Sequence, residues 1–275
     1  MTLGEALRES AEDLERAGVE SPRLDVELIA EHALGLGRVD LYTQRDRVLT
    51  DAKIAFLRGL VDRRAAREPL AYVLGEWGFR HLTLRTDSRA LVPRPETEVL
   101  VERALALLDG LDAPHVLDVG VGSGAVALSL ARERPGVRVT ATDISADAIA
   151  LARENADALG LEVELVHTNL LDGVDGPFDL VVSNPPYVHE DELAALEPEV
   201  RDWEPHKALL DEGQTLAIAR DARRVLARAG ALAVEVHEHE AAATAAAFAA
   251  LGYHPVAVTR DLAGRERVVE ARWTP

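Results

Sequence analysis

The chain has 275 residues, of which 48% are hydrophobic, and a formal net charge of −18. This length suffices for a full α/β domain and a smaller one, and the hydrophobic fraction excludes a wholly disordered chain. The absence of cysteine excludes disulfides, thiolate nucleophiles and cysteine-ligated zinc.

The negative charge is concentrated in the second part of the chain. Residues 1–85 carry 13 basic and 15 acidic side chains, whereas residues 86–275 carry 17 and 33. An acidic surface repels a phosphate backbone, so we expect no direct binding to nucleic acid, although a bias in genome composition would also produce this charge. The first residues match no secretory leader, and no apolar stretch is long enough for a membrane span. We therefore expect a cytoplasmic protein with no membrane contact.

Helical spacing of apolar residues dominates the first part of the chain. Thr2 and Glu5 fit a capping box, and Ser21 followed by Pro22 fits an N-cap with a first-turn proline. We predict a small helical bundle over residues 1–68.

The pattern changes over the next segment. Gly75 and Gly78 interrupt residues 70–85, whose last part alternates apolar and polar side chains. We predict a β-hairpin in a linker at residues 69–88.

Short apolar strands alternate with helical patterns from residue 115 onward, which is typical of an α/β sheet. The expected strands are residues 115–119, 137–142, 163–167, 178–183, 231–236, 253–259 and 267–273. The expected helices are residues 125–134, 146–159, 212–227 and 241–250. We predict a Rossmann-like domain over residues 89–275, with a seven-stranded mixed sheet that ends in a hairpin.

A glycine-rich loop follows the first of these strands and opens a helix. Gly120, Gly122 and Gly124 would let the backbone turn sharply and let a ligand approach the positive end of the helix dipole. Asp143 ends the next strand, where a carboxylate can accept both hydrogens of a ribose diol. This spacing predicts an adenosine-containing cofactor, although a tight turn without a ligand has the same residues.

The loop is also compatible with the pattern of dinucleotide-binding enzymes, so an NAD enzyme stays open at this point. Asp118 lies directly before the glycines. Its carboxylate would face a pyrophosphate unfavourably, but it could bind the ammonium group of a methionine moiety. This residue favours S-adenosylmethionine as the cofactor.

An Asn-Pro-Pro-Tyr motif follows the strand at residues 178–183, at the sheet edge where ligands of such sheets bind. Pro185 and Pro186 have no backbone donor, so the groups that remain for a ligand are acceptors: the Asn184 side-chain oxygen and the Pro185 carbonyl. Two acceptors suit the two hydrogens of an NH2 group on a planar system, and the Tyr187 ring can pack on that plane. We predict Asn184, Pro185 and Tyr187 as catalytic residues and Pro186 as a further substrate contact.

The chemistry that this motif predicts is an in-line displacement at a sulfonium methyl group, with no covalent intermediate on the enzyme. A planar amide or amine nitrogen is a weak nucleophile, because its lone pair is delocalised. Holding it in line with the methyl can supply about 7–11 kcal/mol of the barrier in favourable cases.

Three further segments narrow the interpretation. Leu-Val-Pro-Arg-Pro-Glu-Thr-Glu at residues 91–98, Gly-Glu-Trp-Gly-Phe at 75–79 and Asp-Leu-Ala-Gly-Arg-Glu-Arg-Val-Val at 261–269 accompany the motif at 184–187. This set closely resembles the release factor glutamine methyltransferase family over essentially the whole chain. The resemblance implies methylation of the glutamine in the Gly-Gly-Gln loop of class 1 peptide chain release factors.

The resemblance also implies roles for single residues. Asn184 and the Pro185 carbonyl would hold the glutamine amide, Tyr187 would pack on it, and Asn184 would also border the cofactor. The cofactor pocket would include the following residues: Asp118, Gly120, Gly122, Gly124, Asp143 and Asn169.

Two positions depart from the family pattern. Asn169 stands where an aspartate beside the adenine is common, and its side-chain oxygen can still accept from the adenine amino group. His237 replaces a glycine that commonly follows Glu-(Ile/Val). The resemblance makes the first 68 residues a substrate-recognition domain, and nothing in the sequence demands more than a monomer.

Other features give weaker signals. The nine histidines form no set with metal-ligand spacing, so we expect no catalytic metal. Arginines at positions 58, 63, 64 and 67 form a basic stretch that is either a solvated face or a dock for an acidic partner. Two other functions stay open: amino-methylation of adenine or guanine in nucleic acid, and cofactor sensing by an interaction protein.

Overall fold

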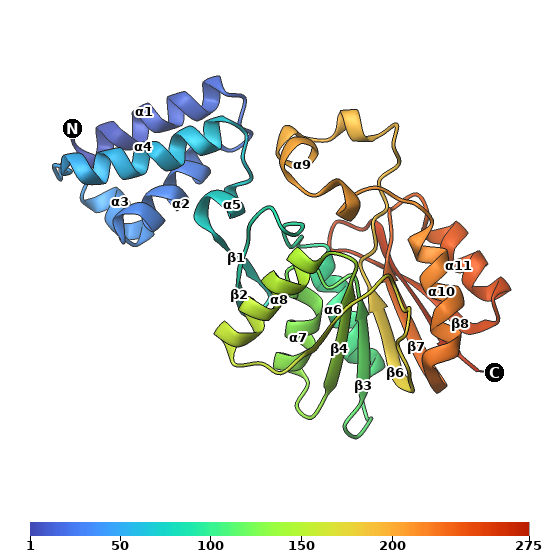
Figure 1. Cartoon of the computed structure of the whole chain (residues 1–275). Coiled ribbons are helices and arrows are strands. Elements are labelled where there is room, and N and C mark those ends of the chain that lie inside the picture. The colour runs from blue at the N-terminus through green and yellow to red at the C-terminus, as the bar shows by residue number, and fades with distance from the viewer. Residues whose placement is uncertain (275) are drawn as a thin grey trace. The chain divides into compact units, whose positions relative to one another are not determined.

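The computed structural model describes residues 1–274, and these form two compact units (Figure 1). The first, here called the helical unit, comprises Met1–Glu76 and Leu196–Trp203. The second, the sheet unit, comprises Trp77–Ala195 and the chain from Glu204 onward. A compact unit need not be an independent folding domain, so the linear division expected at residues 68 and 88 stays a prediction.

The helical unit contains α1 (Leu3–Arg16), α2 (Pro22–Leu34), α3 (Arg38–Thr43), α4 (Asp51–Ala65) and α5 (Leu70–Leu74), together with α9 (Pro198–Trp203). The capping box that opens α1 is confirmed: the Thr2 hydroxyl accepts from the Glu5 N–H, and the Glu5 carboxylate accepts from the Thr2 N–H at 2.7 Å. Fully buried Leu3, Leu14 and Ile29 form part of its core.

The hairpin is shorter than expected, because Leu70–Leu74 is a helix. The apolar run Leu-Ala-Tyr-Val-Leu does not alternate, and Gly75 ends it in the left-handed conformation that favours a helix C-terminus. Strands β1 (Glu76–Phe79) and β2 (Leu82–Arg85) form the hairpin that remains.

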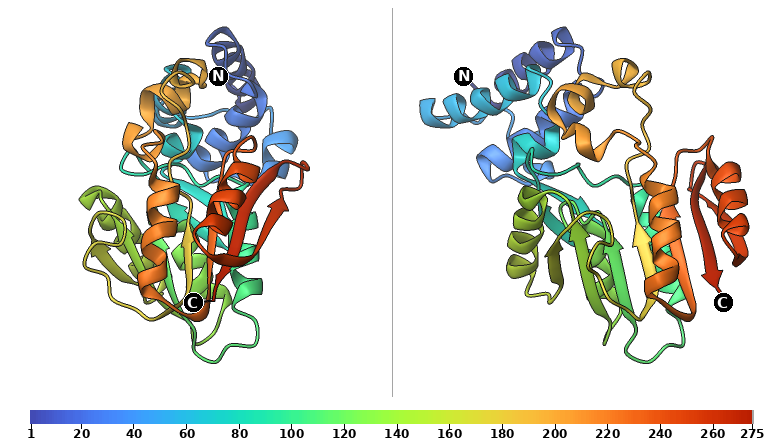
Figure 2. Two further views of the ribbon diagram at one scale, coloured as in Figure 1. Left: turned by 90° about the vertical axis from the view of Figure 1, so that its right-hand side faces the viewer. Right: turned by 45° about the vertical axis from the view of Figure 1, so that its right-hand side comes forward.

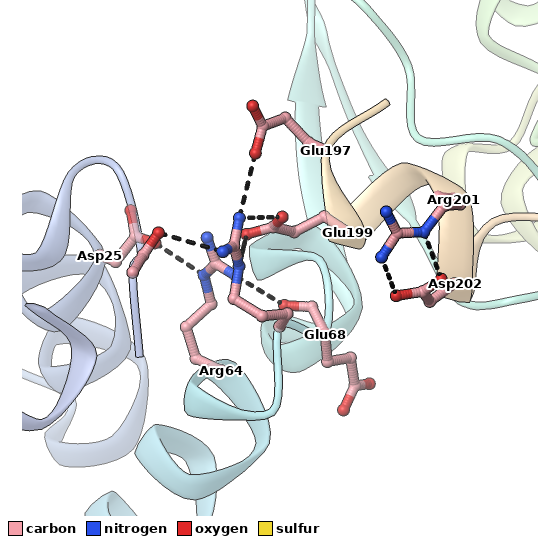
Figure 3. A network of polar contacts seen from close by, with 9 residues as sticks. Asp25, Arg64, Glu68, Glu197, Glu199, Arg201 and Asp202 are labelled. Atoms are coloured by element: carbon pink, nitrogen blue, oxygen red, sulfur yellow. Dashed lines mark hydrogen bonds and ion pairs between the residues drawn. The ribbon is translucent and has the colours of Figure 1, made fainter. Parts of the chain in front are cut away.

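Arginines of α4 and the turn after it form an ion-pair network inside the helical unit (Figure 3). Arg64 donates through Nε to Asp25 and through Nη1 to Glu199, both at 2.7 Å. Arg67 donates to Glu199 at 2.7 and 2.6 Å and to Glu197 at 3.1 Å. The expectation of a solvated or partner-docking basic face is therefore wrong for these two arginines, because acidic residues distant in the sequence use their donors.

The sheet unit contains the expected seven-stranded mixed sheet, in the order β5-β4-β3-β6-β7-β9-β8. Its strands are β3 (His115–Val119), β4 (Arg138–Asp143), β5 (Glu164–His167), β6 (Phe178–Ser183), β7 (Leu226–Glu235), β8 (Tyr253–Arg260) and β9 (Glu266–Trp273). The first five pair in parallel, and β9 pairs antiparallel with both β7 and β8.

Helices cover both faces of this sheet (Figure 2). One face packs against α6 (Thr97–Leu107), α7 (Ala125–Glu133) and α8 (Ala146–Leu159), and the other against α10 (Gln214–Val225) and α11 (Ala241–Ala250). Neighbouring strand residues serve opposite cores: Val116 belongs to the first and Leu117 to the second. Burial on both faces explains why the central strands β3 and β6 are apolar runs rather than alternating patterns.

Two short 3-10 helices, Leu193–Ala195 and His206–Ala208, flank α9 in the chain. In the part of the chain that the structure describes, no helix has the length and apolar character needed to cross a membrane.

Candidate active site

The loop between β3 and α7 has the backbone that its glycines allow. Gly122 and Gly124 have φ values of +54° and +92°. A Cβ atom at Gly122 would meet nothing within 4 Å, whereas at Gly124 it would lie 2.7 Å from Leu128 Cδ1. Gly124 therefore lets α7 pack closely, while Gly122 borders open space. This cradle fits a ligand that approaches the backbone, as the sequence predicts for the cofactor.

Hydrogen bonds fix the loop to the end of β4. The N–H groups of Gly120 and Val121 donate to the Thr142 carbonyl at 2.8 and 2.9 Å. The Gly122 N–H donates to Asp143 Oδ2 at 3.0 Å. The predicted ribose-binding carboxylate is thus held beside the predicted cradle.

Asp143 is held on its other oxygen as well, because Oδ1 accepts from the Ser145 N–H at 2.8 Å. Burial raises the pKa of Asp143 above its ordinary value, and the hydrogen bonds from Gly122 and Ser145 oppose that rise. Each carboxylate oxygen has a second lone pair, so acceptor capacity for a ribose diol remains.

Asp118 is almost completely buried at the end of β3, and its Oδ2 accepts from the Ala127 N–H at 3.0 Å. This bond ties the strand to the first turn of α7, a structural role that the sequence does not reveal. Burial raises the pKa of Asp118 to about 8, against the hydrogen bond from Ala127 and with help from the negative charge of Asp143. An ammonium group of a ligand would offset this cost, and that role stays a prediction.

The Asn-Pro-Pro-Tyr motif directly follows β6, the strand next to β3. The Ser183 hydroxyl donates to the Val119 carbonyl at 2.7 Å, which joins the residue before the motif to the residue before the glycine loop. The strand register also pairs Ser183 with Val119. The two motifs that the sequence singled out therefore leave the sheet side by side.

Both polar side chains of the motif have partners. Asn184 Nδ2 donates to Thr97 Oγ1 at 3.0 Å, and Tyr187 Oη lies 3.4 Å from Glu235 Oε1. Burial raises the pKa of the Tyr187 hydroxyl above its ordinary value, and the charge of Glu235 adds to the effect. Tyr187 is thus a neutral, largely buried ring, which suits packing on a planar group.

The sequence analysis missed Thr97 and Glu235 as site residues. Thr97 is the first residue of α6, and Glu235 is the last residue of β7. The sequence signal that could have identified Glu235 is a glutamate at the end of the apolar strand segment Ala-Leu-Ala-Val-Glu, and the structure shows this side chain to be fully buried. Thr97 lies within the segment at 91–98, where only a resemblance marked it.

The segments at 91–98 and 261–269 lie together near this site. Arg265 Nη2 donates to Glu96 Oε1 at 2.8 Å. Arg94 Nη2 donates to the buried Glu204 at 2.6 Å. Burial raises the pKa of Glu204, and Arg94 opposes this, so the pair serves to compensate a buried carboxylate.

Asn169 and His237, the two departures from the family pattern, have different surroundings. Asn169 is exposed in the turn after β5, and its carbonyl accepts from the Asp172 N–H. The His237 ring lies 6.2 Å from the Tyr187 ring, measured between centroids. The structure thus brings His237 to the motif, while a contact of Asn169 with adenine stays a prediction.

Histidine spacing did not reveal a cluster that the fold creates. Three possible ligand atoms, from His189, Asp211 and Glu240, lie within 4.8 Å of one another, and His189 Nε2 pairs with Glu240 at 2.9 Å.

A separate hollow lies at the other end of the sheet, where β3 and β4 begin, and is lined by His115, Arg138 and other residues. None of its lining residues belongs to the predicted site.

The seven-stranded sheet, the glycine loop with its acidic partner and the adjacent acceptor motif define a Rossmann-like methyltransferase that uses S-adenosylmethionine. Comparison with family models agrees, since residues 5–75 match the PrmC N-terminal domain and residues 96–251 match the methyltransferase small domain. The chain belongs to the release factor glutamine methyltransferase family, which confirms the resemblance seen in the sequence.

Curated relatives are similar over almost the whole chain. The release factor glutamine methyltransferase of Deinococcus radiodurans is 43% identical, with 99% of both chains covered. That of Rhodospirillum rubrum is 41% identical, covering 99% of this chain and 85% of its own.

Solved structures support the fold. A methyltransferase from Pyrococcus furiosus has a TM-score of 0.52 at 19% identity, covering 71% of this chain and 90% of its own. The 16S rRNA N2 G1207 methyltransferase of T. thermophilus has a TM-score of 0.54 at 17% identity, covering 72% and 49%.

Proposed function

We propose that this protein transfers the methyl group of S-adenosylmethionine to the side-chain amide nitrogen of the glutamine in the Gly-Gly-Gln loop of class 1 peptide chain release factors. The observation that carries the proposal is the placement of the acceptor motif at residues 184–187 directly beside the glycine loop. The names of relatives that match 99% of the chain support the substrate.

The acceptor groups would orient the substrate. Asn184 Oδ1 and the Pro185 carbonyl accept the two hydrogens of the glutamine NH2, which points the nitrogen lone pair away from both. The Tyr187 ring packs on the amide plane and excludes water. Because these groups are fixed before the substrate binds, their contribution is positioning rather than base catalysis.

The cofactor, when bound, supplies an electrophilic methyl group on a sulfonium sulfur. The nitrogen–carbon bond forms as the carbon–sulfur bond breaks, and the bond electrons leave with sulfur. Once methylated, the nitrogen carries positive charge, and a hydrogen on it becomes acidic. That proton then passes to solvent. This methyl transfer requires neither a metal ion nor a buried base beside the substrate nitrogen.

Residues of the glycine loop and its surroundings would hold this cofactor. Asp143 would accept the ribose hydroxyls, Asp118 would compensate the methionine ammonium, and Asn169 would accept from the adenine amino group. Gly120 and Gly122 would let the cofactor lie close to the backbone, because the space that a Cβ atom would fill at either position is open.

The helical unit would recognise the protein substrate, by analogy with the matched N-terminal domain of the family. The acidic charge of residues 86–275 favours a protein rather than a nucleic acid as substrate. We propose that the enzyme acts as a monomer in the cytoplasm.

Methyl transfer in vitro tests this function. The purified protein, S-adenosylmethionine and a class 1 release factor are incubated, and the peptide around Gly-Gly-Gln is analysed by mass spectrometry. One added methyl on that glutamine, absent from a release factor with alanine in its place, is the expected result. If calorimetry showed cofactor binding but the release factor stayed unmethylated, the protein would still be a methyltransferase, but the proposed substrate would be wrong. Single-stranded and duplex nucleic acids would then be assayed as substrates.

A further inference from the structure

His189 and Asp211 lie beside each other because two loops pair over a short stretch. The Val188 N–H donates to the Leu209 carbonyl, and the Asp211 N–H donates to the Val188 carbonyl, both at 2.9 Å. These bonds form a parallel bridge between Val188 and Leu210. In a parallel pair, residues at the same offset from a bridge are neighbours on one face. His189 and Asp211, each one residue further along the chain, therefore project in the same direction.

Glu240 reaches this pair from a third loop. It directly precedes α11, and its N–H donates to the His237 carbonyl at 2.9 Å in the turn that follows β7. Its Oε1 lies 2.9 Å from His189 Nε2. One imidazole nitrogen and an oxygen from each of two carboxylates thus lie within 4.8 Å of one another. All three residues belong to the sheet unit.

The negative charge of this cluster is not balanced by arginine or lysine. Among residues 1–274, Glu240 forms an ion pair with His189 alone, and Asp211 forms none with a cationic side chain. Glu192 adds a further carboxylate, because its Oε2 accepts from the His189 N–H at 3.2 Å. By contrast, Glu199 is held by two arginines. A divalent cation would balance the two carboxylates that converge on His189.

The donor atoms suit a divalent transition metal. Zinc, iron and nickel ions accept an imidazole nitrogen beside carboxylate oxygens, whereas Mg2+ and Ca2+ select oxygen ligands. Asp211 Oδ1 accepts from the Gly213 N–H at 2.7 Å, which fixes this carboxylate and leaves further lone pairs for a ligand.

The spacing of the donor atoms is close to that of a zinc site. Zn–N and Zn–O bonds of about 2.0–2.2 Å place the ligand atoms of a tetrahedral ion about 3.3–3.6 Å apart. The side chains of His189 and Glu240 are 50% and 34% exposed, so they have room to rotate. A movement of about 1 Å would bring the three atoms to this spacing.

We propose that His189 Nε2 and one carboxylate oxygen each of Asp211 and Glu240 bind a divalent transition-metal ion, for which Zn2+ is the probe. Binding replaces the proton of the hydrogen bond between His189 and Glu240, and that proton passes to solvent. Water fills the remaining coordination positions. The ion takes no part in methyl transfer, and the site does not rest on the proposed function.

An ion at this place would join the loops on two sides of the Tyr187 ring. His189 follows Tyr187 by two residues in the loop after β6. Glu240 lies in the loop after β7, where the His237 ring is 6.2 Å from the Tyr187 ring. The expected consequence of metal binding is therefore greater order in residues 188–192 and 237–240.

Calorimetric titration of the untagged, full-length protein with Zn2+ tests the site. We expect one zinc ion for each wild-type chain. His189→Ala and Asp211→Asn should each weaken binding by at least about 10–100-fold, the loss that follows removal of a residue that merely supports a metal ligand. His239→Ala is the matched control, because its ring lies 5.2 Å from that of His237 but outside the three-residue cluster. It should bind zinc like the wild type, and excess Mg2+ should not displace the ion.

Thermal melts and amide hydrogen exchange report the effect on the fold. At a zinc concentration about 100-fold above the dissociation constant, the Tm of the wild type should rise by about 5–10 °C, whereas that of His189→Ala should not change. Zinc should slow exchange in residues 188–192 and 237–240 of the wild type and of His239→Ala, but not of Asp211→Asn. Absence of saturable binding by the wild type, equal affinity of His189→Ala, or loss of binding in His239→Ala would overturn the proposal.

Discussion

Arg64 Nη1 lies 2.7 Å from Glu199 Oε1, although 135 residues separate them in the chain. Both side chains are largely buried, at 8% and 15% exposed. Burial acts to raise the pKa of Glu199, but hydrogen bonds from Arg67 and Arg64 outweigh it, so the net pKa lies below its ordinary value. The segment Leu196–Trp203 thus belongs to the helical unit through charge pairing rather than an apolar core.

Removal of Glu199 should destabilise the helical unit strongly. Glu199→Gln leaves the buried Arg64 paired with Asp25, so we expect a cost toward the lower end of the about 3–5 kcal/mol that breaking a buried ion pair entails. Urea denaturation followed by circular dichroism measures the effect. Asp202→Asn is the control, because its pair with Arg201 is more exposed and such pairs contribute about 0–1 kcal/mol. Equal urea midpoints for Glu199→Gln and Asp202→Asn would contradict the stabilising role of the ion-pair network.

The same network should weaken in acid. The pKa of Glu199 is lowered on folding, so its stabilising contribution is complete above the unfolded value of about 4.5. It is lost as the pH falls through the lower folded value. The stability difference between wild type and Glu199→Gln, measured in urea, should therefore be constant from pH 8 to 6 and shrink below pH 4.5.

Replacement of Asp118 by asparagine should stabilise the protein but weaken cofactor binding. Its pKa rises to about 8 on folding, so the folded protein loses stability as the pH rises from about 4 toward 8. Asp118→Asn retains an acceptor for the Ala127 N–H and removes this loss. At pH 8 we expect a higher Tm without cofactor, by about 2–4 °C for each kcal/mol gained, and weaker binding of S-adenosylmethionine.

Calorimetry and thermal melts at pH 5 and pH 8 check this expectation. The gain in Tm should be smaller at pH 5, where Asp118 of the wild type is protonated. A variant that binds the cofactor as tightly as the wild type would exclude Asp118 as the partner of the ammonium group.

Gly122 and Gly124 of the glycine loop should differ in what they support. Gly124→Ala places a Cβ 2.7 Å from Leu128 Cδ1 in a backbone conformation that L-residues avoid, so we expect loss of stability. Gly122→Ala meets no protein atom within 4 Å, so the fold should survive at a cost of about 1–2 kcal/mol. Its methyl group enters the predicted cofactor space. Calorimetry should therefore show weakened binding by a folded Gly122→Ala protein.

Local patterns in the sequence were sufficient for much of this fold. The strand at 115–119, the glycine loop and the motif at 184–187 each depend on a few consecutive residues, and a parallel sheet brings the ends of neighbouring strands together. The helix at Leu70–Leu74 was missed because two glycines nearby suggested a turn in the wrong place. Propensity over five residues is a weak guide.

The contacts between distant residues could not be predicted in this way. Thr97 meets Asn184 because α6 starts beside the end of β6, which depends on how the fold packs this helix on the sheet. Arg64 meets Glu199 because a segment of the second half of the chain folds with the first. Neither relationship leaves a pattern in consecutive residues, so the basic stretch around Arg64 suggested a solvated face or a docking site instead.

Asn184→Ala should separate an enzyme from a cofactor-sensing protein. The substitution removes the side-chain acceptor for the substrate NH2 and leaves the glycine loop, with its bonds to Thr142 and Asp143, in place. By analogy with removal of one preorganised polar contact, we expect turnover to fall by about 10²–10³-fold. Affinity for S-adenosylmethionine, measured by calorimetry, should change far less. If turnover and affinity fell together, Asn184 would chiefly bind the cofactor, and the Pro185 carbonyl would be the acceptor that remains for the substrate.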